Sequence, residues 1–162
     1  MDPTLTREAL ERLISEQSAT LTRLEELLGR EHGLLAARDI ESLAAAGRDR
    51  QACVGALLRL EEERASLCRM LGHGADADGM RTLLARCDPD GRLANRWTGC
   101  TELTRRCRKL NDRNGALATA QLRHVTGRLE ALTGGAQRGK DTYSPQGAAR
   151  ATPTGRLLAA QA

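Results

Sequence analysis

The sequence has almost no aromatic residues and few β-branched aliphatic ones. It contains no Phe, one Trp (Trp97) and one Tyr (Tyr143), so aromatic residues make up 1% of its 162 residues. Val and Ile are equally scarce, with two of each. Because strands favour β-branched and aromatic side chains, this composition argues against a β-sandwich or a barrel. It also argues against a stacking platform for RNA or single-stranded DNA, which needs several exposed rings.

Signals for membrane insertion or export are also lacking. No segment approaches the run of about 18 apolar residues that a transmembrane helix needs. The first residues, Met-Asp-Pro-Thr, have neither the basic nor the apolar region of a signal peptide. The cysteines are odd in number, so we expect reduced, buried thiols. These absences predict a cytoplasmic protein with no stable membrane insertion.

Leu and Ala supply most of the apolar residues, and this composition suits packed helices. Apolar residues recur at steps of three and four over residues 5–37, 39–71 and 91–133, and a shorter pattern covers 78–87. These patterns predict an all-α fold, an elongated antiparallel helical bundle of three long helices plus a short connector helix, formed by residues 1–133. Residues 134–162 are rich in Gly, Ala, Thr, Pro and Gln, and predict a flexible, disordered C-terminal tail.

The formal net charge of +4 is unevenly distributed. The tail contains four basic residues and one acidic residue and so carries +3, whereas residues 1–133 are nearly neutral with mixed signs. Four cations would neutralise few phosphates, so we expect no nucleic-acid partner. The alternative is a small nucleic-acid-associated protein that binds through the basic tail.

No group of residues points to catalysis, a metal or a cofactor. The three histidines are far apart, and no Cys-x-x-Cys pair occurs. Cys100 and Cys107 are seven residues apart, wider than the usual spacing of zinc ligands, and fit better as neighbours on one buried helix face. The segment Asp76–Asp78 lacks the further acidic positions of a calcium loop. No phosphate-binding loop, dinucleotide motif or nucleophile elbow is present, so we expect no enzyme and no cofactor.

The last predicted helix contains the sequence Asn111-Asp112-Arg113-Asn114-Gly115. Continuing the helical period from Trp97, which we expect to anchor the core, places Asn111 and Asn114 near the inward face. Buried amides there can fix the register of a bundle. Gly115 would let another helix approach closely. An Asn-Gly pair is also a turn signal, so a break in the helix is the alternative.

Tyr143 lies in the segment Thr-Tyr-Ser-Pro-Gln-Gly of the basic tail, where there is no core to bury it. A lone ring in such a place is either inert or an anchor for a partner's pocket, since Tyr gives a large contact area at low entropic cost.

Several of these features together resemble the FlgN family. They are the Leu-rich first helix with its glutamates, the Asp-Ile-Glu-Ser-Leu restart at 39–43, a Trp that opens the last long helix, Asn-x-x-Asn-Gly at 111–115 and Tyr-Ser-Pro-Gln-Gly at 143–147. Members are flagellar export chaperones for the hook-filament junction proteins. The resemblance covers roughly residues 5–147.

The resemblance implies a small cytoplasmic bundle of long helices that binds hook-associated proteins and prevents their premature self-association. It further implies delivery of these clients to the export gate of the flagellar type III apparatus, with the gate's ATPase complex as a further candidate partner. The bound part of the client is a terminal helical region. The family's tail tyrosine is implicated in contact with the gate and corresponds here to Tyr143.

A client helix can pack its apolar stripe onto an exposed seam of such a bundle. The candidate client-binding residues lie in the last predicted helix and are Leu117, Leu122, Val125, Leu129 and Leu132. For each of them, ordinary bundle core is an equally good interpretation. A generic helical coiled-coil adaptor without an export role is the alternative function, and whether the free protein is a monomer or a homodimer is left open.

Overall fold

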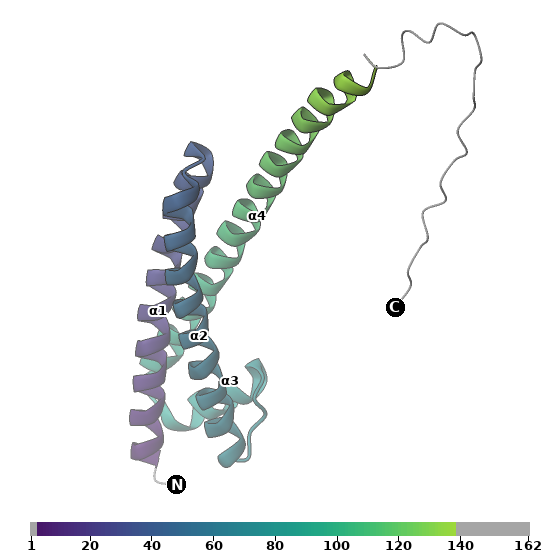
Figure 1. Ribbon diagram of the computed structural model, residues 1–162. Coiled ribbons are helices and arrows are strands. Elements are labelled where there is room, and N and C mark those ends of the chain that lie inside the picture. The colour runs from purple at the N-terminus through teal and green to yellow at the C-terminus, as the bar shows by residue number, and fades with distance from the viewer. Residues whose placement is uncertain (1–2, 139–162) are drawn as a thin grey trace, which may run out of the picture. The chain divides into compact units, whose positions relative to one another are not determined.

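The computed structural model describes residues 3–138, which form four helices joined by short loops (Figure 1). The helices are α1 (Pro3–Ala37), α2 (Ile40–Met70), α3 (Ala77–Cys87) and α4 (Arg92–Arg138). No strand occurs over this range, so the predicted all-α fold is confirmed. The chain divides into two compact units, Met1–Gln121 and Leu122–Ala162, and α4 contributes residues to both.

The helix bounds differ little from those expected, except at the end of α4. This helix continues without a break through Asn111–Gly115, so the Asn-Gly pair does not act as a turn. It also passes the expected end at residue 133 and runs through Gly134 and Gly135 to Arg138. Glycine lowers helix stability by about 1 kcal/mol relative to Ala but does not sterically forbid the helix. The predicted boundary between bundle and tail remains a prediction, and most of the tail lies outside the described residues.

Helices α2 and α3 each begin at an aspartate whose carboxylate accepts a local hydrogen bond. The carboxylate of Asp39 accepts a bond from the backbone N–H of Ser42 at 3.0 Å and caps α2. The carboxylate of Asp76 accepts from the N–H of Gly79 at 2.8 Å and caps α3. Just after α2, Gly72 has φ 75°, the left-handed conformation that glycine adopts most easily. The two Asp caps and this glycine are local features, so residues close in sequence set these helix ends.

In the first unit, α1 and α2 run antiparallel, side by side (Figure 1). Two ion pairs fix their direction: Arg12 near the start of α1 reaches Glu63 near the end of α2, and Glu31 reaches Arg50 at 2.9 Å. Residues 92–121 of α4 run antiparallel to α2, because Arg64 lies over Trp97 while Arg50, earlier in α2, reaches Asn111, later in α4. This part of α4 is therefore parallel to α1. The three long helices therefore form the antiparallel, up-down-up arrangement that the sequence predicted, with α3 as the connector.

The core of the first unit is built from leucines on one face of α1 and apolar residues of the other three helices. The largest fully buried side chains are those of Leu10, Ile14, Leu28, Met80, Leu93, Cys68 and Cys100. All five cysteines of the chain are buried free thiols, as the sequence predicted. Each apolar side chain of Leu or Ile size contributes roughly 1.5–3 kcal/mol when it is fully removed from water, so the core that all four helices share stabilises the first unit.

The α1–α4 pair shows a repeat that we call the seven-residue ladder. At every seventh position of α4, a side chain donates a hydrogen bond to the carbonyl oxygen of the α1 residue 86 positions earlier. The four pairs are Cys100 with Ile14, Cys107 with Leu21, Asn114 with Leu28, and Gln121 with Leu35. The constant separation shows that the two helices stay in one register over the whole contact, as in a parallel coiled coil.

Candidate functional site

Four of the five candidate client-binding residues lie in the second unit and are exposed. Leu122 is 67% exposed, Val125 51%, Leu129 56% and Leu132 73%. Their spacing of three, four and three residues places them on one side of α4. We call these four residues the α4 stripe. The fifth candidate, Leu117, belongs to the first unit and is half-buried.

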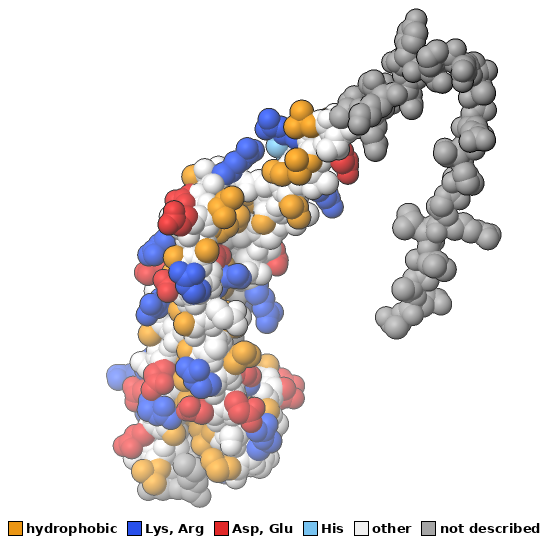
Figure 2. Space-filling model, in the orientation of Figure 1, with side chains coloured by type: hydrophobic (Ala, Val, Ile, Leu, Met, Phe, Trp, Pro, Cys, Tyr) orange, Lys and Arg blue, Asp and Glu red, His pale blue; other side chains and the backbone are white. Residues whose placement is uncertain are grey.

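Polar and charged residues flank the α4 stripe. Arg123, His124, Arg128 and Glu130 come from the same turns of α4 and are exposed. Figure 2 shows blue and red side chains next to orange ones along this part of the molecule. No heavy atom lies within 4 Å of where a Cβ would stand on Gly127, in the middle of the stripe. This segment of α4 is therefore an amphipathic helix whose apolar side is open to solvent over the described residues.

An apolar stripe of this kind fits recognition of a helix by a helix. Clusters of exposed large hydrophobic residues mark sites of interaction, because water contact with them is unfavourable. Residues at steps of three and four are the positions at which two helices interdigitate when they pack along one another. The stripe therefore has the spacing and the apolar chemistry that suit a second helix packed along it.

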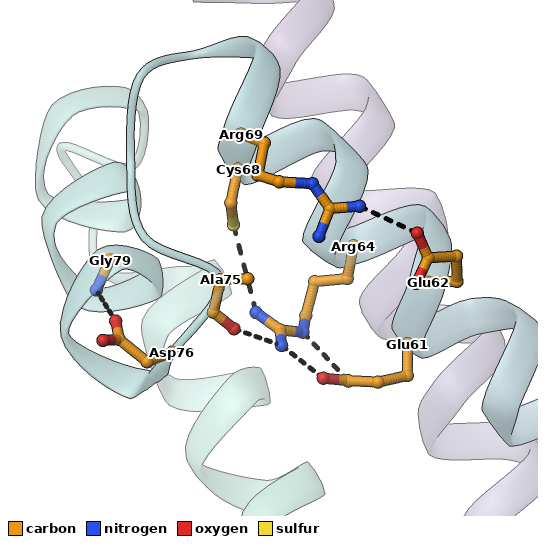
Figure 3. A network of polar contacts seen from close by, with 8 residues as sticks. All are labelled: Glu61, Glu62, Arg64, Cys68, Arg69, Ala75, Asp76 and Gly79. Atoms are coloured by element: carbon orange, nitrogen blue, oxygen red, sulfur yellow. Dashed lines mark hydrogen bonds and ion pairs between the residues drawn. The ribbon is translucent and has the colours of Figure 1, made fainter.

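A second feature of the first unit is a buried arginine, shown in Figure 3. Arg64 of α2 donates from Nε to the carboxylate of Glu61 at 3.0 Å, and from Nη2 to the same carboxylate and to the carbonyl oxygen of Ala75 at 2.7 Å. Its guanidinium lies 5.5 Å from the centre of the Trp97 ring. The bond to Glu61 raises the pKa of Arg64, so the side chain stays charged. This network joins α2 to the loop before α3 and to α4.

Trp97 was expected to anchor the core, but it is half-buried and packs against the edge of the core instead. One face of the indole is used by Arg64, a cation–π contact that is favourable when the cation is largely removed from water. Arg64 and Trp97 come from different helices, so no regular spacing in the sequence indicates this contact.

The Asn111–Gly115 segment only partly matches expectation. Asn114 is 6% exposed, and its amide donates to the carbonyl oxygen of Leu28 at 2.9 Å and accepts from Nδ1 of His32 at 3.0 Å. Asn111 was expected to face inward, but it is exposed and accepts a bond from Arg50 at 3.3 Å. The reason is that three residues turn the helix face by about 60° relative to Asn114. At Gly115 the expected close helix approach is absent, since no atom lies within 4 Å of a Cβ there.

Ligand groups for a metal are not gathered in the part of the chain that the structure describes. Over residues 3–138 no group of three or more His, Cys, Asp or Glu side chains is placed to hold an ion. Burial raises the pKa of the Cys100 and Cys107 thiols, which disfavours the thiolate that a metal or an electrophile requires. Within the same residues no helix is long and apolar enough to cross a membrane. Tyr143, the candidate for docking to the export gate, lies outside the described residues.

The fold and the exposed stripe define a class, that of small all-helical proteins with an apolar helix face open to solvent. The sequence model described as FlgN protein matches residues 1–151, and the chain belongs to the FlgN family. This is a family of flagellar export chaperones, so a general chaperone role in flagellar assembly follows. Comparisons with curated proteins and with solved structures found no match.

Proposed function

We propose that this protein is the export chaperone of hook-associated flagellar proteins, that it prevents their premature self-association, and that it acts in the cytoplasm. The observation that carries the proposal is the α4 stripe, an exposed apolar helix face in a member of an export chaperone family. A client's terminal helix would cover the stripe and in turn have its own apolar face covered. Both surfaces would thereby be protected from self-association until export.

Client binding would depend on apolar contact at the centre of the stripe. Val125 and Leu129 are each about half exposed, so each has surface that a client helix can bury. Burying a side chain of this type contributes roughly 1.5–3 kcal/mol at most. Replacing both by Asp also forces two carboxylates against an apolar surface, which is costly unless they are paired.

The test is binding of the terminal helical segments of hook-filament junction proteins, measured by calorimetry. We expect Val125→Asp with Leu129→Asp to weaken binding at least about 100-fold while helicity is retained. A matched control is Ile40→Asp with Leu58→Asp, which places the same charges on exposed apolar residues of α2. Equal affinity of the stripe variant and the wild type would show that clients bind elsewhere.

Delivery would be a separate step that uses the tail. We propose that Tyr143 contacts the export gate, as the family resemblance implies, with the gate's ATPase complex as a second candidate partner. Tyr143→Ala should then leave client affinity unchanged and reduce retention of the client-loaded chaperone on the isolated gate protein. If Tyr143→Ala also weakened client binding, the division between stripe and tail would be wrong.

A generic helical adaptor without an export role is the competing function. It predicts no preference for hook-junction segments over unrelated amphipathic helices. Calorimetry with both kinds of peptide therefore separates the two, and sedimentation of the free protein shows whether it is a monomer or a homodimer.

A further inference from the structure

A groove of about 530 Å³ opens in the first unit, away from the α4 stripe in sequence. Trp97, Thr101, Thr104 and Arg108 line it along α4, and Arg64 of α2 lines it from the facing helix. We call it the Trp97 groove. The four α4 residues are spaced by four, three and four, so the groove follows one helix face for about three turns, or roughly 16 Å. A groove of this form suits a helix better than a compact small molecule.

The polar groups at one side of the groove are already engaged. Glu61 binds Arg64, and the carboxylate of Asp76 caps α3 by accepting from Gly79. Ala75 accepts from Arg64 through its carbonyl oxygen. These contacts are local (Figure 3), and both carboxylates already accept hydrogen bonds from groups on their own side of the groove.

On the opposite side, two cations of α4 line the groove without a partner. Arg105 and Arg108 are exposed and form no ion pair among the described residues. They belong to the most basic element of the chain, since residues 92–134 hold nine basic and three acidic side chains. Residues 1–133 are nearly neutral in sum only because acidic residues of the other helices offset the positive charge of α4.

We propose that the Trp97 groove docks an acidic amphipathic helix of a partner protein. The apolar side of that helix would contact Trp97 and the methyl groups of Thr101 and Thr104, and its carboxylates would pair with Arg105 and Arg108. The chain's own tail does not fit this role, because it carries +3 and would bring like charges together.

This docking surface does not depend on the client-binding proposal, because its residues lie in the first unit and the α4 stripe lies in the second. It also supplies its own probe. Trp97 is the only Trp of the chain and lines the groove, so its fluorescence reports occupancy directly.

The experiment titrates the full-length protein with a synthetic helix of about 18 residues that carries Leu at steps of three and four and Glu on both flanks. A matched peptide has Lys in place of every Glu. We expect the acidic peptide alone to shift Trp97 emission saturably, with an affinity that falls as salt is added. Arg105→Glu with Arg108→Glu should weaken binding at least about tenfold.

The control variant is Arg23→Glu with Arg30→Glu, which makes the same change of charge at exposed positions of α1 outside both the groove and the α4 stripe, and should bind the acidic peptide like the wild type. Equal response to both peptides, or no loss on reversing Arg105 and Arg108, would overturn the proposal. A change in Trp97 emission that accompanies self-association, measured by sedimentation, would also overturn it. The same holds if duplex DNA changes the emission and the peptide does not. The variant Val125→Asp with Leu129→Asp should retain full response, so failure at the stripe and failure at the groove are separable.

Discussion

Asn114 of α4 donates a hydrogen bond from its side-chain amide to the carbonyl oxygen of Leu28 on α1, at 2.9 Å. Because this bond orients the amide, its oxygen faces Nδ1 of His32, which lies 3.0 Å away and carries the hydrogen. Asn114 is thus the third step of the seven-residue ladder and its most fully satisfied polar member. A buried amide in this position stabilises only one register of the two helices.

Removing this amide should destabilise the bundle. Asn114→Ala leaves His32 without its partner and opens a small cavity, and we expect a loss of about 1–3 kcal/mol in the free energy of unfolding. Urea unfolding followed by circular dichroism measures it. Asn111→Ala is the control: the side chain is exposed, and we expect a change below about 0.5 kcal/mol. If the two variants were equally stable, the ladder would not hold the register.

The end of α1 carries a conformational cost that a single substitution can remove. Arg38 has φ 58°, and the N–H groups of Arg38 and Asp39 bond to the carbonyl oxygens of Leu35 and Leu34 in the hydrogen-bond pattern of a Schellman motif. Non-glycine residues pay roughly 1 kcal/mol in the left-handed region. Arg38→Gly should therefore raise the free energy of unfolding by about 0.5–1 kcal/mol.

The control for this prediction is the same chemical change in the body of the helix. Arg30→Gly, at an exposed position within α1, should instead lower stability by about 1 kcal/mol. Thermal and urea denaturation of both variants give the two signs. A loss of stability on Arg38→Gly would mean that the arginine side chain contributes more than its backbone costs.

The secondary structure could be predicted from the sequence because local signals agree. Three kinds of signal act within a few residues: leucines at steps of three and four, the caps at Asp39 and Asp76, and Gly72. Helices α2 and α3 begin and end close to where these signals indicate. The end of α4 could not be predicted, because Gly134 and Gly135 weaken a helix without ending it.

The candidate sites depended on tertiary contacts, and here the sequence predicted less. The spacing of Cys100, Cys107 and Asn114 indicated one face of α4, and adding seven once more would have found Gln121, which continues the ladder with a bond of 2.6 Å to the carbonyl oxygen of Leu35. The contact between Arg64 and Trp97 joins two different helices, so no regular spacing along the sequence indicates it. The basic character of α4 is not visible in the net charge of residues 1–133, because acidic residues of the other helices offset it.

Acid should destabilise the protein in part through Glu25. Its carboxylate accepts a bond from Nε of Arg106 at 2.6 Å, and this bond lowers the pKa of Glu25. A carboxylate whose pKa is lower in the folded state stabilises the fold above its unfolded pKa, near 4.3, and that contribution is lost as the pH falls through the folded value.

We therefore expect wild-type stability to fall from about pH 5 downward, and Arg106→Gln to reduce the slope of that fall. The difference between the two proteins should be largest above about pH 5 and should vanish in stronger acid. Urea midpoints across the pH range measure it. Arg105→Gln, next in sequence but without an ion pair among the described residues, should leave the slope unchanged. Parallel curves for wild type and Arg106→Gln would contradict the assignment to Glu25.

The buried cysteines should be unreactive in the folded protein. Cys100 and Cys107 are almost fully buried in the seven-residue ladder, and burial raises the pKa of both thiols, so little thiolate forms near neutral pH. Alkylation by iodoacetamide, followed by mass spectrometry, should label these positions only as fast as the protein opens, and all five cysteines should react in urea.

The variant Asn114→Ala removes the step of the ladder that follows Cys107. We expect alkylation of Cys107 to speed up more than alkylation of Cys68, a buried residue of α2 that is not part of the ladder. Equal acceleration at both cysteines would show global opening, and the ladder would then not be a local unit of stability.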